Sequence, residues 1–596
     1  MLSVAKAGLA SRKTRVYAAR MNKALRLLPL LLAAACTTGN PVPPAMAAAP
    51  AADGATFGAM TTAADPRGAE AGLAMLRQGG NAIDAAAAMM LAMTVVEPQS
   101  SGIGGGGFLM YQAAGARNPD SFDGREKAPM AATDRLFMGA DGKPMSGREA
   151  VPGGKSVGVP GNVAMVAMAH ARHGKLPWAA LFKPAIELAR GGYEITPRMA
   201  RSIASSAPRL ALTPEATAIY LNADGTPKPA GTRIVNEALA QTLEAIASQG
   251  PKAFYTGRVA QSIVTRVTTA PMNPATMTLA DLAGYEAKAR IPVCGQYRSY
   301  KVCSMGPPSA GGTAVIAILK QLEGFDLGKL GAASPVSWHL FAESSRLAFA
   351  DRATYGGDAD FVEVPTAGLV SDEYLRARGG LIKAEARMAV AEAGTPRGAL
   401  AFTPGPGGEV PSTTHFAAAD GSGNVASWTS TVEGGFGSQM VASGMVLNNE
   451  LTDFSFEPEK NGAPVANRVQ GGKRPRSSMA PAIVYDARGQ VVLAVGAAGG
   501  MTIPAQVAKA IIGVLDWKLS VSDAIALPLV YVNGDTLYAE GGEQGDMLKP
   551  IVPALEAMGH KVVVTPLGLK ANGLERTAKG WRGGADPRSE GTSLGF

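Results

Sequence analysis

The chain has few of the residues that most often bind metal ions. Among its 596 residues there are three cysteines and five histidines. His170 and His173 have the spacing to share one face of a helix, but no third ligand accompanies them. A solvated helix face is the simpler interpretation of this pair, so the sequence predicts no metal site.

Outside the N-terminal segment, the chain has almost no net excess of positive or negative charge. The formal net charge is +8, and residues 1–36 contain seven basic and no acidic side chains, which leaves +1 for the rest. With so little net positive charge, the chain after residue 36 has no general basic bias that would attract nucleic acid. The 46% apolar and 17% charged content excludes a disordered, collagen-like or coiled-coil chain.

The apolar run from Leu27 to Ala35 is too short to span a bilayer, which takes about 20 residues. Because basic residues precede the run, residues 1–36 are predicted to be a signal peptide. The segment ending at Cys36 resembles a bacterial lipobox, which predicts a lipidated periplasmic protein held at the outer membrane. Ordinary cleavage after Ala47 would instead give a soluble periplasmic protein. Residues 37–53, rich in Pro and Ala, are interpreted as a tether.

The other two cysteines, Cys294 and Cys303, have eight residues between them, in a segment with strand-like composition. If Arg298 and Ser299 form a two-residue turn, the cysteines face each other across a hairpin. An exported compartment permits a disulfide there, and two buried free thiols are the alternative.

Helical patterns come first in the chain and strand patterns follow. Residues 65–97 have the periodicity of two helices, with Asn81 as the N-cap of the second. Residues 160–390 are mostly helical in pattern, whereas 414–432 and 482–495 alternate as hairpins do. Strands enclosed by helices predict a layered α/β structure.

The short motif Pro411–Phe416 (PSTTHF), where helical patterns give way to strand patterns, has residues suited to catalysis. If the peptide bond between Ser412 and Thr413 is cut, Thr413 gains an α-amine, whose ordinary pKa is about 7.7–8.0. This amine can act as the general base for the hydroxyl of the same residue, so one residue supplies both nucleophile and base. Taken alone, the motif is more often a strand with surface hydroxyl groups.

Ordered motifs along most of the chain strengthen the chemical interpretation. From about Gly54 to Phe596 the sequence resembles the γ-glutamyltranspeptidase family of N-terminal-nucleophile hydrolases. The motifs that carry the resemblance are Glu97–Phe108 (EPQSSGIGGGGF), Gly124–Pro129 (GREKAP), Gly306–Gly312 (GPPSAGG), Thr413–Phe416 (TTHF), Leu447–Phe454 (LNNELTDF), Lys473–Met479 (KRPRSSM), Gly499-Gly500 and Asp586–Ser589 (DPRS).

The resemblance implies catalytic roles for four residues. Thr413 would cleave the precursor after Ser412 and then attack the substrate, and the Thr431 hydroxyl would bond to this nucleophile. Gly499 and Gly500 would form an oxyanion hole, in which backbone N–H groups approach the oxyanion without a Cβ in the way.

A γ-glutamyl group carries a carboxylate and an ammonium on one carbon. The resemblance implies that Arg125 binds the carboxylate through two parallel hydrogen bonds, assisted by the hydroxyls of Ser477 and Ser478. It also implies that Asp453 holds the ammonium. These residues would select γ-glutamyl compounds among amides.

The sequence departs from the family pattern in two ways. Glu433 and Glu450 stand in the same binding shell where many members carry amides, so the shell is more acidic here. The segment between Asp453 and Arg474 has 20 residues and no Tyr, whereas many members place a covering tyrosine there. We therefore expect an open groove, tolerance of large leaving groups such as γ-glutamyl chains, and substantial hydrolysis beside transfer.

The implied fold is the four-layer αββα sandwich, autoprocessed into a large piece, 54–412, and a small piece, 413–596, whose strands pair in the same sheets. The implied reaction is transfer of the γ-glutamyl group of glutathione or a related amide to water, an amino acid or a peptide, without cofactor or metal. One alternative is an acylase for another amide, such as a cephalosporin side chain. Another is an inactive lipoprotein that serves as a scaffold.

Overall fold

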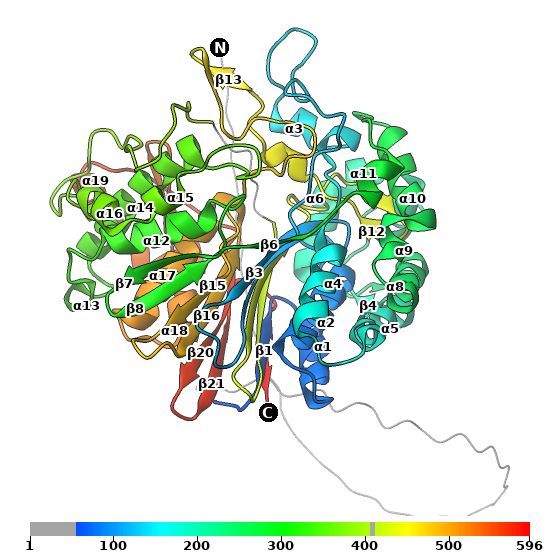
Figure 1. Ribbon diagram of the computed structural model, residues 1–596, viewed down its shortest axis with the longest axis horizontal. Coiled ribbons are helices and arrows are strands. Elements are labelled where there is room, and N and C mark those ends of the chain that lie inside the picture. Colours follow the sequence, from blue (N-terminus) through cyan, green and yellow to red (C-terminus); the bar gives the residue numbers. More distant parts are fainter. Residues whose placement is uncertain (1–54, 406–411) are drawn as a thin grey trace, which may run out of the picture. The chain divides into compact units, whose positions relative to one another are not determined.

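The structure is a computed structural model that describes residues 55–405 and 412–596 (Figure 1). The predicted signal peptide, the tether and the lipidation site at Cys36 lie outside the described residues. Within the described ranges, no helix combines the length and the apolar character needed to cross a membrane.

Two sheets form the centre of the described chain. In spatial order the first consists of β22 (Thr592–Gly595), β1 (Met60–Ala63), β9 (Thr414–Ala419), β10 (Val425–Thr431), β2 (Gly106–Gln112), β3 (Asp120–Asp123) and β6 (Lys288–Arg290). The second consists of β21 (Gly580–Ala585), β20 (Lys570–Thr577), β16 (Val491–Ala498), β15 (Ala482–Tyr485), β8 (Tyr300–Ser304) and β7 (Val293–Tyr297).

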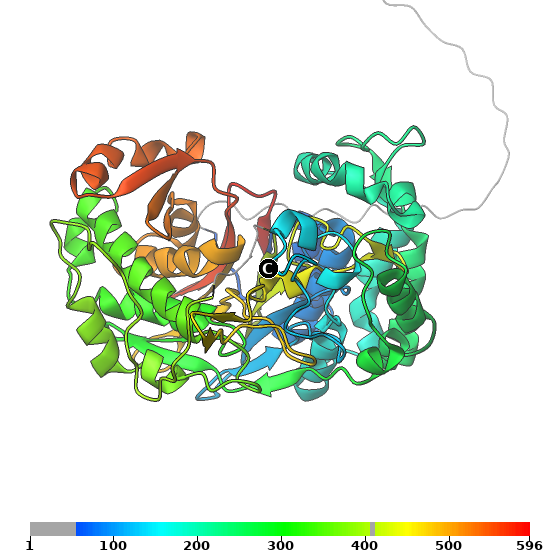
Figure 2. The same cartoon turned by 90° about the horizontal axis from the view of Figure 1, so that it is seen from above.

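Helices cover the outer face of each sheet (Figure 2). On the first sheet, α1 (Pro66–Arg77) packs on β1, and α2 (Ala82–Val96) packs on β9 and β10. On the second, α12 (Gly311–Gln321) and α17 (Ile503–Leu515) pack on β7, β8 and β16, and α14 (Pro335–Tyr355) packs on α12. Strands of the two sheets contact each other, so the order of layers is helix, sheet, sheet, helix. The predicted αββα sandwich is confirmed.

The remaining elements surround these layers. The helices are α3 (Gly147–Ala150), α4 (Asn162–His173), α5 (Lys183–Gly191), α6 (Pro197–Leu210), α7 (Pro214–Tyr220), α8 (Glu237–Gln249), α9 (Lys252–Tyr255), α10 (Gly257–Thr268), α11 (Leu279–Ala283), α13 (Leu327–Leu330), α15 (Thr366–Leu369), α16 (Asp372–Gly379), α18 (Val521–Ala526) and α19 (Val552–Ala557). Short 3-10 helices are η1 (Gly154–Ser156), η2 (Trp178–Phe182), η3 (Glu450–Asp453), η4 (Gly500–Thr502) and η5 (Glu543–Leu548). The strands are β4 (Tyr193–Glu194), β5 (Arg233–Ile234), β11 (Val441–Ala442), β12 (Met445–Val446), β13 (Glu459–Lys460), β14 (Ala463–Pro464), β17 (Val530–Asn533), β18 (Thr536–Glu540) and β19 (Lys561–Thr565).

The composition of α2 explains its central place. Every residue of this helix is buried, and its sequence is apolar nearly all round, as is typical of a helix enclosed by others. Its start is fixed locally by a capping box, in which Asn81 Oδ1 accepts from the Asp84 N–H and Asp84 Oδ2 accepts from the Asn81 N–H. The two helices predicted over residues 65–97 are confirmed.

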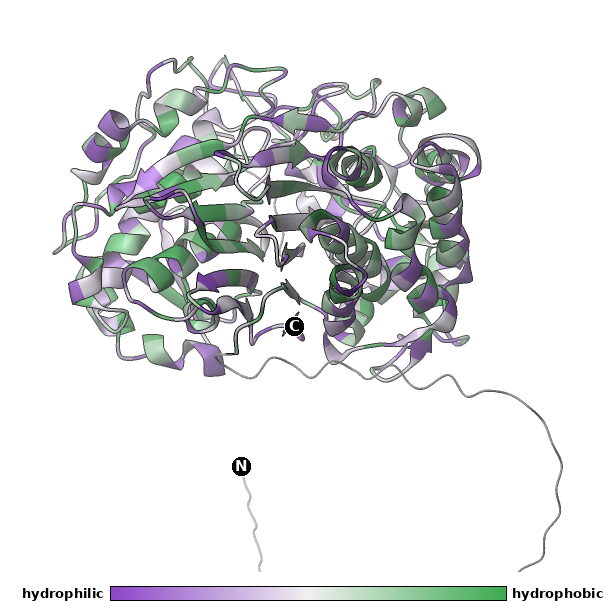
Figure 3. Cartoon of the chain, turned by 60° about the horizontal axis from the view of Figure 1, so that its bottom comes forward, coloured by the Kyte–Doolittle hydropathy of each residue, from purple (hydrophilic) through white to green (hydrophobic). Residues whose placement is uncertain are grey.

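Apolar clusters fill the spaces between the layers. The cluster between the two sheets includes Met60, Met110, Ile483, Leu574 and Trp581. Larger clusters lie between each sheet and its helices. Hydrophobic segments accordingly dominate the interior, while hydrophilic residues are spread over the outer surfaces (Figure 3).

Strands from both sides of the Ser412–Thr413 bond share each sheet. The β9–β10 hairpin lies between β1 and β2 in the first sheet, and β15 lies between β8 and β16 in the second. The pairs β1–β9, β2–β10 and β8–β15 each join a strand that precedes this bond to one that follows it, so residues on the two sides of the bond share both sheets.

The cysteine hairpin is also as predicted. Cys294 on β7 pairs with Cys303 on β8, and their sulfurs form a disulfide. The turn between the strands contains Arg298, whose φ of 54° is the left-handed conformation that tight hairpin turns require.

Candidate active site

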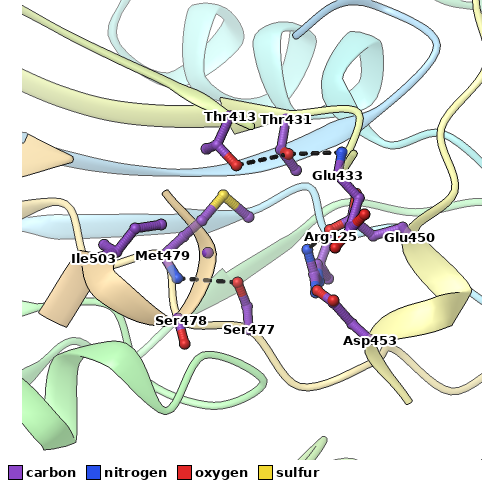
Figure 4. A pocket seen from close by; sticks show the side chains of 11 residues that line it. Arg125, Thr413, Thr431, Glu433, Glu450, Asp453, Ser477, Ser478, Met479 and Ile503 are labelled. Atoms are coloured by element: carbon purple, nitrogen blue, oxygen red, sulfur yellow. Dashed lines mark hydrogen bonds and ion pairs between the residues drawn. The ribbon is translucent and has the colours of Figure 1, made fainter. Parts of the chain in front are cut away.

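The two predicted catalytic threonines lie side by side. Thr413 directly precedes β9, and Thr431 ends β10, its antiparallel neighbour, so the start of one strand meets the end of the other. Their Oγ1 atoms are 3.0 Å apart (Figure 4). Thr431 Oγ1 also accepts a hydrogen bond of 2.8 Å from the backbone N–H of Glu433. The Thr431 hydroxyl can therefore donate its own hydrogen to Thr413 Oγ1.

The backbone at Thr413 is strained. Its φ is 75°, in the left-handed region, where a β-branched side chain is rare and costs about 1–3 kcal/mol. On the other side of the same peptide bond, the Ser412 hydroxyl is held by a hydrogen bond of 2.8 Å to the carbonyl of Gln99. The predicted cleavage site thus combines a fixed serine with a threonine in an unfavourable conformation.

A pair of glycines leads from β16 towards α17. Gly499 has a φ of 127° and Gly500 a φ of 58°, which a residue with a side chain rarely adopts. A Cβ at Gly499 would lie 2.5 Å from Thr502 Oγ1. Gly500 borders the same cavity as Thr413. Backbone N–H groups ahead of a helix favour negative charge, so this pair can stabilise an oxyanion.

One cavity of about 20 Å³ collects nearly all the residues predicted for the site, and Gly499 directly precedes one of them. The structure adds Met479 and Ile503, for which no separate sequence signal existed. The lining residues are Arg125, Thr413, Thr431, Glu433, Glu450, Asp453, Ser477, Ser478, Met479, Gly500 and Ile503.

Arg125 is 1% exposed and is engaged on every side. One terminal nitrogen donates to Glu450, and the other donates to Asp453 at 2.5 Å and to the Arg476 carbonyl at 2.9 Å. Its Nε donates to the Pro475 carbonyl at 3.2 Å. Burial opposes the charge, but the two carboxylates outweigh it and raise the Arg125 pKa. Any substrate carboxylate therefore has to share the guanidinium with these two acidic side chains.

Glu126 is a member of this shell that the sequence interpretation did not single out, although it lies in the GREKAP motif. Its side chain is fully buried, and neither carboxyl oxygen has a hydrogen-bond partner among the described residues. Burial raises the pKa of Glu126 to about 7 and raises that of Glu450 well above its usual range.

The other polar residues of the cavity differ in how they are held. Glu433 accepts a hydrogen bond of 2.6 Å from the Asn449 amide. Ser477 Oγ accepts from the Met479 N–H at 3.1 Å. The Ser478 hydroxyl is buried and has no hydrogen-bond partner among the described residues, so it is available to a ligand.

A buried ion pair lies next in sequence to the segment that holds Ser412. Lys570 on β20 donates to Glu97 and lies 3.5 Å from Ser100 Oγ. Burial lowers the Lys570 pKa to about 8 despite this partner. Glu97 begins the segment that includes Gln99, the residue that holds Ser412. The motif containing Glu97 was visible in the sequence, but nothing there pointed to Lys570.

The histidine pair on α4 is not a solvated face. His170 Nε2 bonds the Leu176 carbonyl at 2.8 Å, and His173 Nε2 bonds Asp120 at 2.8 Å. Both side chains are 17% exposed. Across the described ranges, no group of three potential ligands is arranged to hold a metal ion.

The short segment after Asp453 packs away from the cavity. None of residues 454–473 contributes to the lining. Phe454 is buried in a small cluster with Phe137, and Phe456 stacks on Phe137 with ring centres 4.4 Å apart. β13 and β14 close the segment into a hairpin.

Comparisons with known proteins identify the family of this chain. The family model described as gamma-glutamyltranspeptidase matches residues 68–596. A protein named glutathione hydrolase proenzyme from Bacillus subtilis (strain 168) is 35% identical over 550 residues, which cover 90% of this chain and 91% of that protein. A protein named acylase ACY 1 proenzyme from Pseudomonas sp. (strain SE83) is 36% identical over 510 residues, covering 84% and 86%.

Solved structures show the same fold. A cephalosporin acylase from Bacillus halodurans superposes with a TM-score of 0.79 at 27% identity and covers 94% of this chain and 98% of that one. A chain of the Helicobacter pylori gamma-glutamyltranspeptidase superposes with a TM-score of 0.53 at 36% identity, covering 56% and 95%. With the family model matching most of its length, this chain belongs to the γ-glutamyltranspeptidase family.

Proposed function

We propose that the protein cleaves itself between Ser412 and Thr413 and then hydrolyses or transfers γ-glutamyl groups. The observation that carries the proposal is the contact of 3.0 Å between the Thr413 and Thr431 hydroxyls, beside a cavity that also contains Arg125 and Asp453. A nucleophile, a donor to that nucleophile, and groups of both charges for an amino-acid head group lie within one small space.

Self-cleavage follows from the same atoms. Thr413 Oγ1 attacks the Ser412 carbonyl carbon, the C–N bond breaks, and the Thr413 nitrogen takes a proton to become an amine. Water then hydrolyses the ester that joins the two pieces. The left-handed backbone at Thr413 favours this step, because cleavage releases the strain.

In turnover, the free amine of Thr413 takes the proton of its own hydroxyl, and the oxygen attacks the γ-amide carbon of the substrate. The Thr431 hydroxyl stabilises the attacking oxygen, and the N–H groups at Gly499 and Gly500 stabilise the oxyanion. The amine leaves with a proton, and a γ-glutamyl ester stays on Thr413. Water or an acceptor amine then takes the acyl group.

The charges of the shell favour a γ-glutamyl donor over an acyl group that has a carboxylate alone. Among the described residues, Asp453 and Glu433 line the cavity with a single cation, Arg125, and the third acidic side chain, Glu450, has a raised pKa. An ammonium suits this excess of acidic groups, whereas a lone carboxylate would meet repulsion from it. An acylase activity is the second candidate, because two similar proteins and one solved structure have acylase names.

Two anilide substrates distinguish a γ-glutamyl transferase or hydrolase from an acylase. γ-Glutamyl-p-nitroanilide and glutaryl-p-nitroanilide differ only in the ammonium. We expect kcat/KM to be at least about tenfold higher for the γ-glutamyl compound, the size of one charge-assisted contact. Equal rates, or faster turnover of the glutaryl compound, would favour the acylase.

Cleavage is tested separately on a denaturing gel. The wild-type chain should appear as two pieces, and N-terminal sequencing of the smaller one should begin at Thr413. Thr413→Ala should stay as one inactive chain. A small piece that begins at another residue would overturn the assignment, and an uncut wild-type chain would favour an inactive scaffold.

The position of residues 454–473 away from the cavity supports easy access of water to the acyl-enzyme. We therefore propose substantial hydrolysis beside transfer. The ratio of glutamate release to transfer onto glycylglycine measures this. A strong preference for transfer at low acceptor concentration, with rejection of oligo-γ-glutamate, would contradict it.

A further inference from the structure

A second and much larger cavity, of about 520 Å³, adjoins the site. One wall is a face of α14 that presents Arg346, Phe349 and Arg352. Another is the turn after β17, which includes Asp535. This volume lies within the range of about 300–1,000 Å³ that is typical of small-molecule sites.

The two cavities share short stretches of backbone as a common wall. Ser477 and Gly500 line the cavity of Thr413. Arg476 and Met501, their immediate neighbours in the chain, line the larger cavity. A substrate bound with its carbonyl at the glycine pair therefore has space for its amine portion next to that pair.

The larger cavity is rich in cationic groups. Of the residues that the structure describes, its lining contains three arginines, Arg346, Arg352 and Arg476, and one carboxylate, Asp535. Arg346 pairs with the buried Glu343 at 2.9 Å, and the Asp535 side chain is 83% exposed. Arginine side chains held by packing bind carboxylates with little loss of freedom.

We propose that this cavity binds the carboxylate groups of the amine portion of the substrate: the amino acid or short peptide that leaves when Thr413 is acylated, and the acceptor that replaces it. The proposal rests on the proposed function, because it assigns the amine side of the same reaction. The apolar side chains of Phe349 and Met501 contact the aliphatic parts of such a group, and the arginines bind its carboxylates. An amine portion with an additional carboxylate is therefore preferred over its neutral analogue.

Two donors with matched leaving groups test the preference. γ-Glutamylglutamate and γ-glutamylglutamine differ by one carboxylate in the part that leaves. The wild-type enzyme should have a higher kcat/KM for the first. Arg346→Gln should lower the ratio of the two kcat/KM values about tenfold, the usual effect of one charge-assisted contact.

A second variant, expected to change the ratio of the two kcat/KM values in the opposite direction, distinguishes the proposal from misfolding. Asp535 is exposed, and Asp535→Asn removes the carboxylate that competes with the ligand, so the ratio should rise about two- to threefold. Arg488→Gln, in a hairpin turn with a side chain 76% exposed, removes the same charge elsewhere and should leave the ratio unchanged. γ-Glutamyl-p-nitroanilide, whose leaving group has no carboxylate, should respond to each variant by less than about twofold.

An unchanged ratio in Arg346→Gln, or a lowered ratio in Asp535→Asn, would overturn the proposal. Titration calorimetry of the wild-type enzyme with glycylglutamate and glycylglutamine separates it from the proposed function, because neither dipeptide contains a γ-glutamyl bond. Preferential binding of glycylglutamate without any γ-glutamyl turnover would support carboxylate binding by the larger cavity and would reject the proposed γ-glutamyl activity. Turnover without any preference for the acidic dipeptide or donor would reject the cavity and leave the function standing.

Discussion

The guanidinium of Arg125 donates a hydrogen bond of 2.5 Å to the carboxylate of Asp453 in the wall of the cavity that contains Thr413. The two groups expected to bind opposite charges of the substrate thus neutralise each other within the protein. This pairing keeps both buried charges compensated. A zwitterionic head group can take its place, because its carboxylate can pair with Arg125 and its ammonium with Asp453. A substrate with one charge alone would leave one partner uncompensated.

Arg125→Lys should lower kcat/KM for glutathione by an amount that corresponds to a loss of about 2–4 kcal/mol in transition-state stabilisation. Lysine keeps the charge but cannot make parallel hydrogen bonds. Steady-state kinetics measures the loss. Self-cleavage should persist, since it involves no substrate, and the two pieces on a gel verify that the variant is folded. Normal kinetics on glutathione would refute the role of Arg125.

Thr431→Val should slow both self-cleavage and turnover by about tenfold to a hundredfold, because it removes the hydroxyl that contacts Thr413 Oγ1 while preserving shape. Pulse labelling of the precursor and steady-state kinetics report the two rates. Thr429→Val is the matched control: its hydroxyl contacts His415 instead, at 2.9 Å, so both rates should stay near wild type. If the two variants behave alike, the effect is structural.

Lys570→Met should destabilise the protein by about 3–5 kcal/mol, because it leaves the buried Glu97 carboxylate without its cation. The double variant Glu97→Gln/Lys570→Met removes both charges and should recover most of the loss. Thermal unfolding at a fixed scan rate compares the three proteins. A double variant no more stable than the single one would show that the charges do not depend on each other.

Stability should fall as the pH drops below about 6.5, the ordinary histidine pKa. Burial lowers the pKa of His415 and of His560 to about 3, so the folded protein keeps both neutral in a range where the unfolded chain binds protons. Their contribution is fully present above pH 6.5 and is lost as the pH falls towards 3, at up to about 1.4 kcal/mol per pH unit for each group.

His560→Asn tests this prediction while leaving His415 in place. Its Tm should fall less steeply between about pH 6.5 and pH 5 than that of the wild type, because one of the two groups no longer titrates. Above pH 7 the two curves should run parallel. Identical slopes at low pH would mean that His560 titrates normally in the folded protein.

Local features of this chain were predictable from the sequence. The start of α2 depends on Asn81 and Asp84, three residues apart, and both members of its capping box are visible in the printed letters. The hairpins of β9–β10 and of the disulfide-linked β7–β8 follow from short alternating runs around tight turns. Such contacts join neighbours in the chain, so periodicity and turn residues are enough to predict them. Thr413 was proposed as the nucleophile because family motifs along most of the chain accompany its short motif, which by itself is not specific.

Which charges pair was decided by the tertiary structure alone. Arg125 meets Glu450 and Asp453 across separations of 325 and 328 residues, and Lys570 meets Glu97 across 473. No local rule relates such positions, because each contact forms only after both sheets have closed around it. The cavity between α14 and β17 arises in the same way, from elements distant in sequence that pack against each other. The sequence by itself predicted the layers and proposed Thr413 as the nucleophile, and packing at long range determined which groups Thr413 faces.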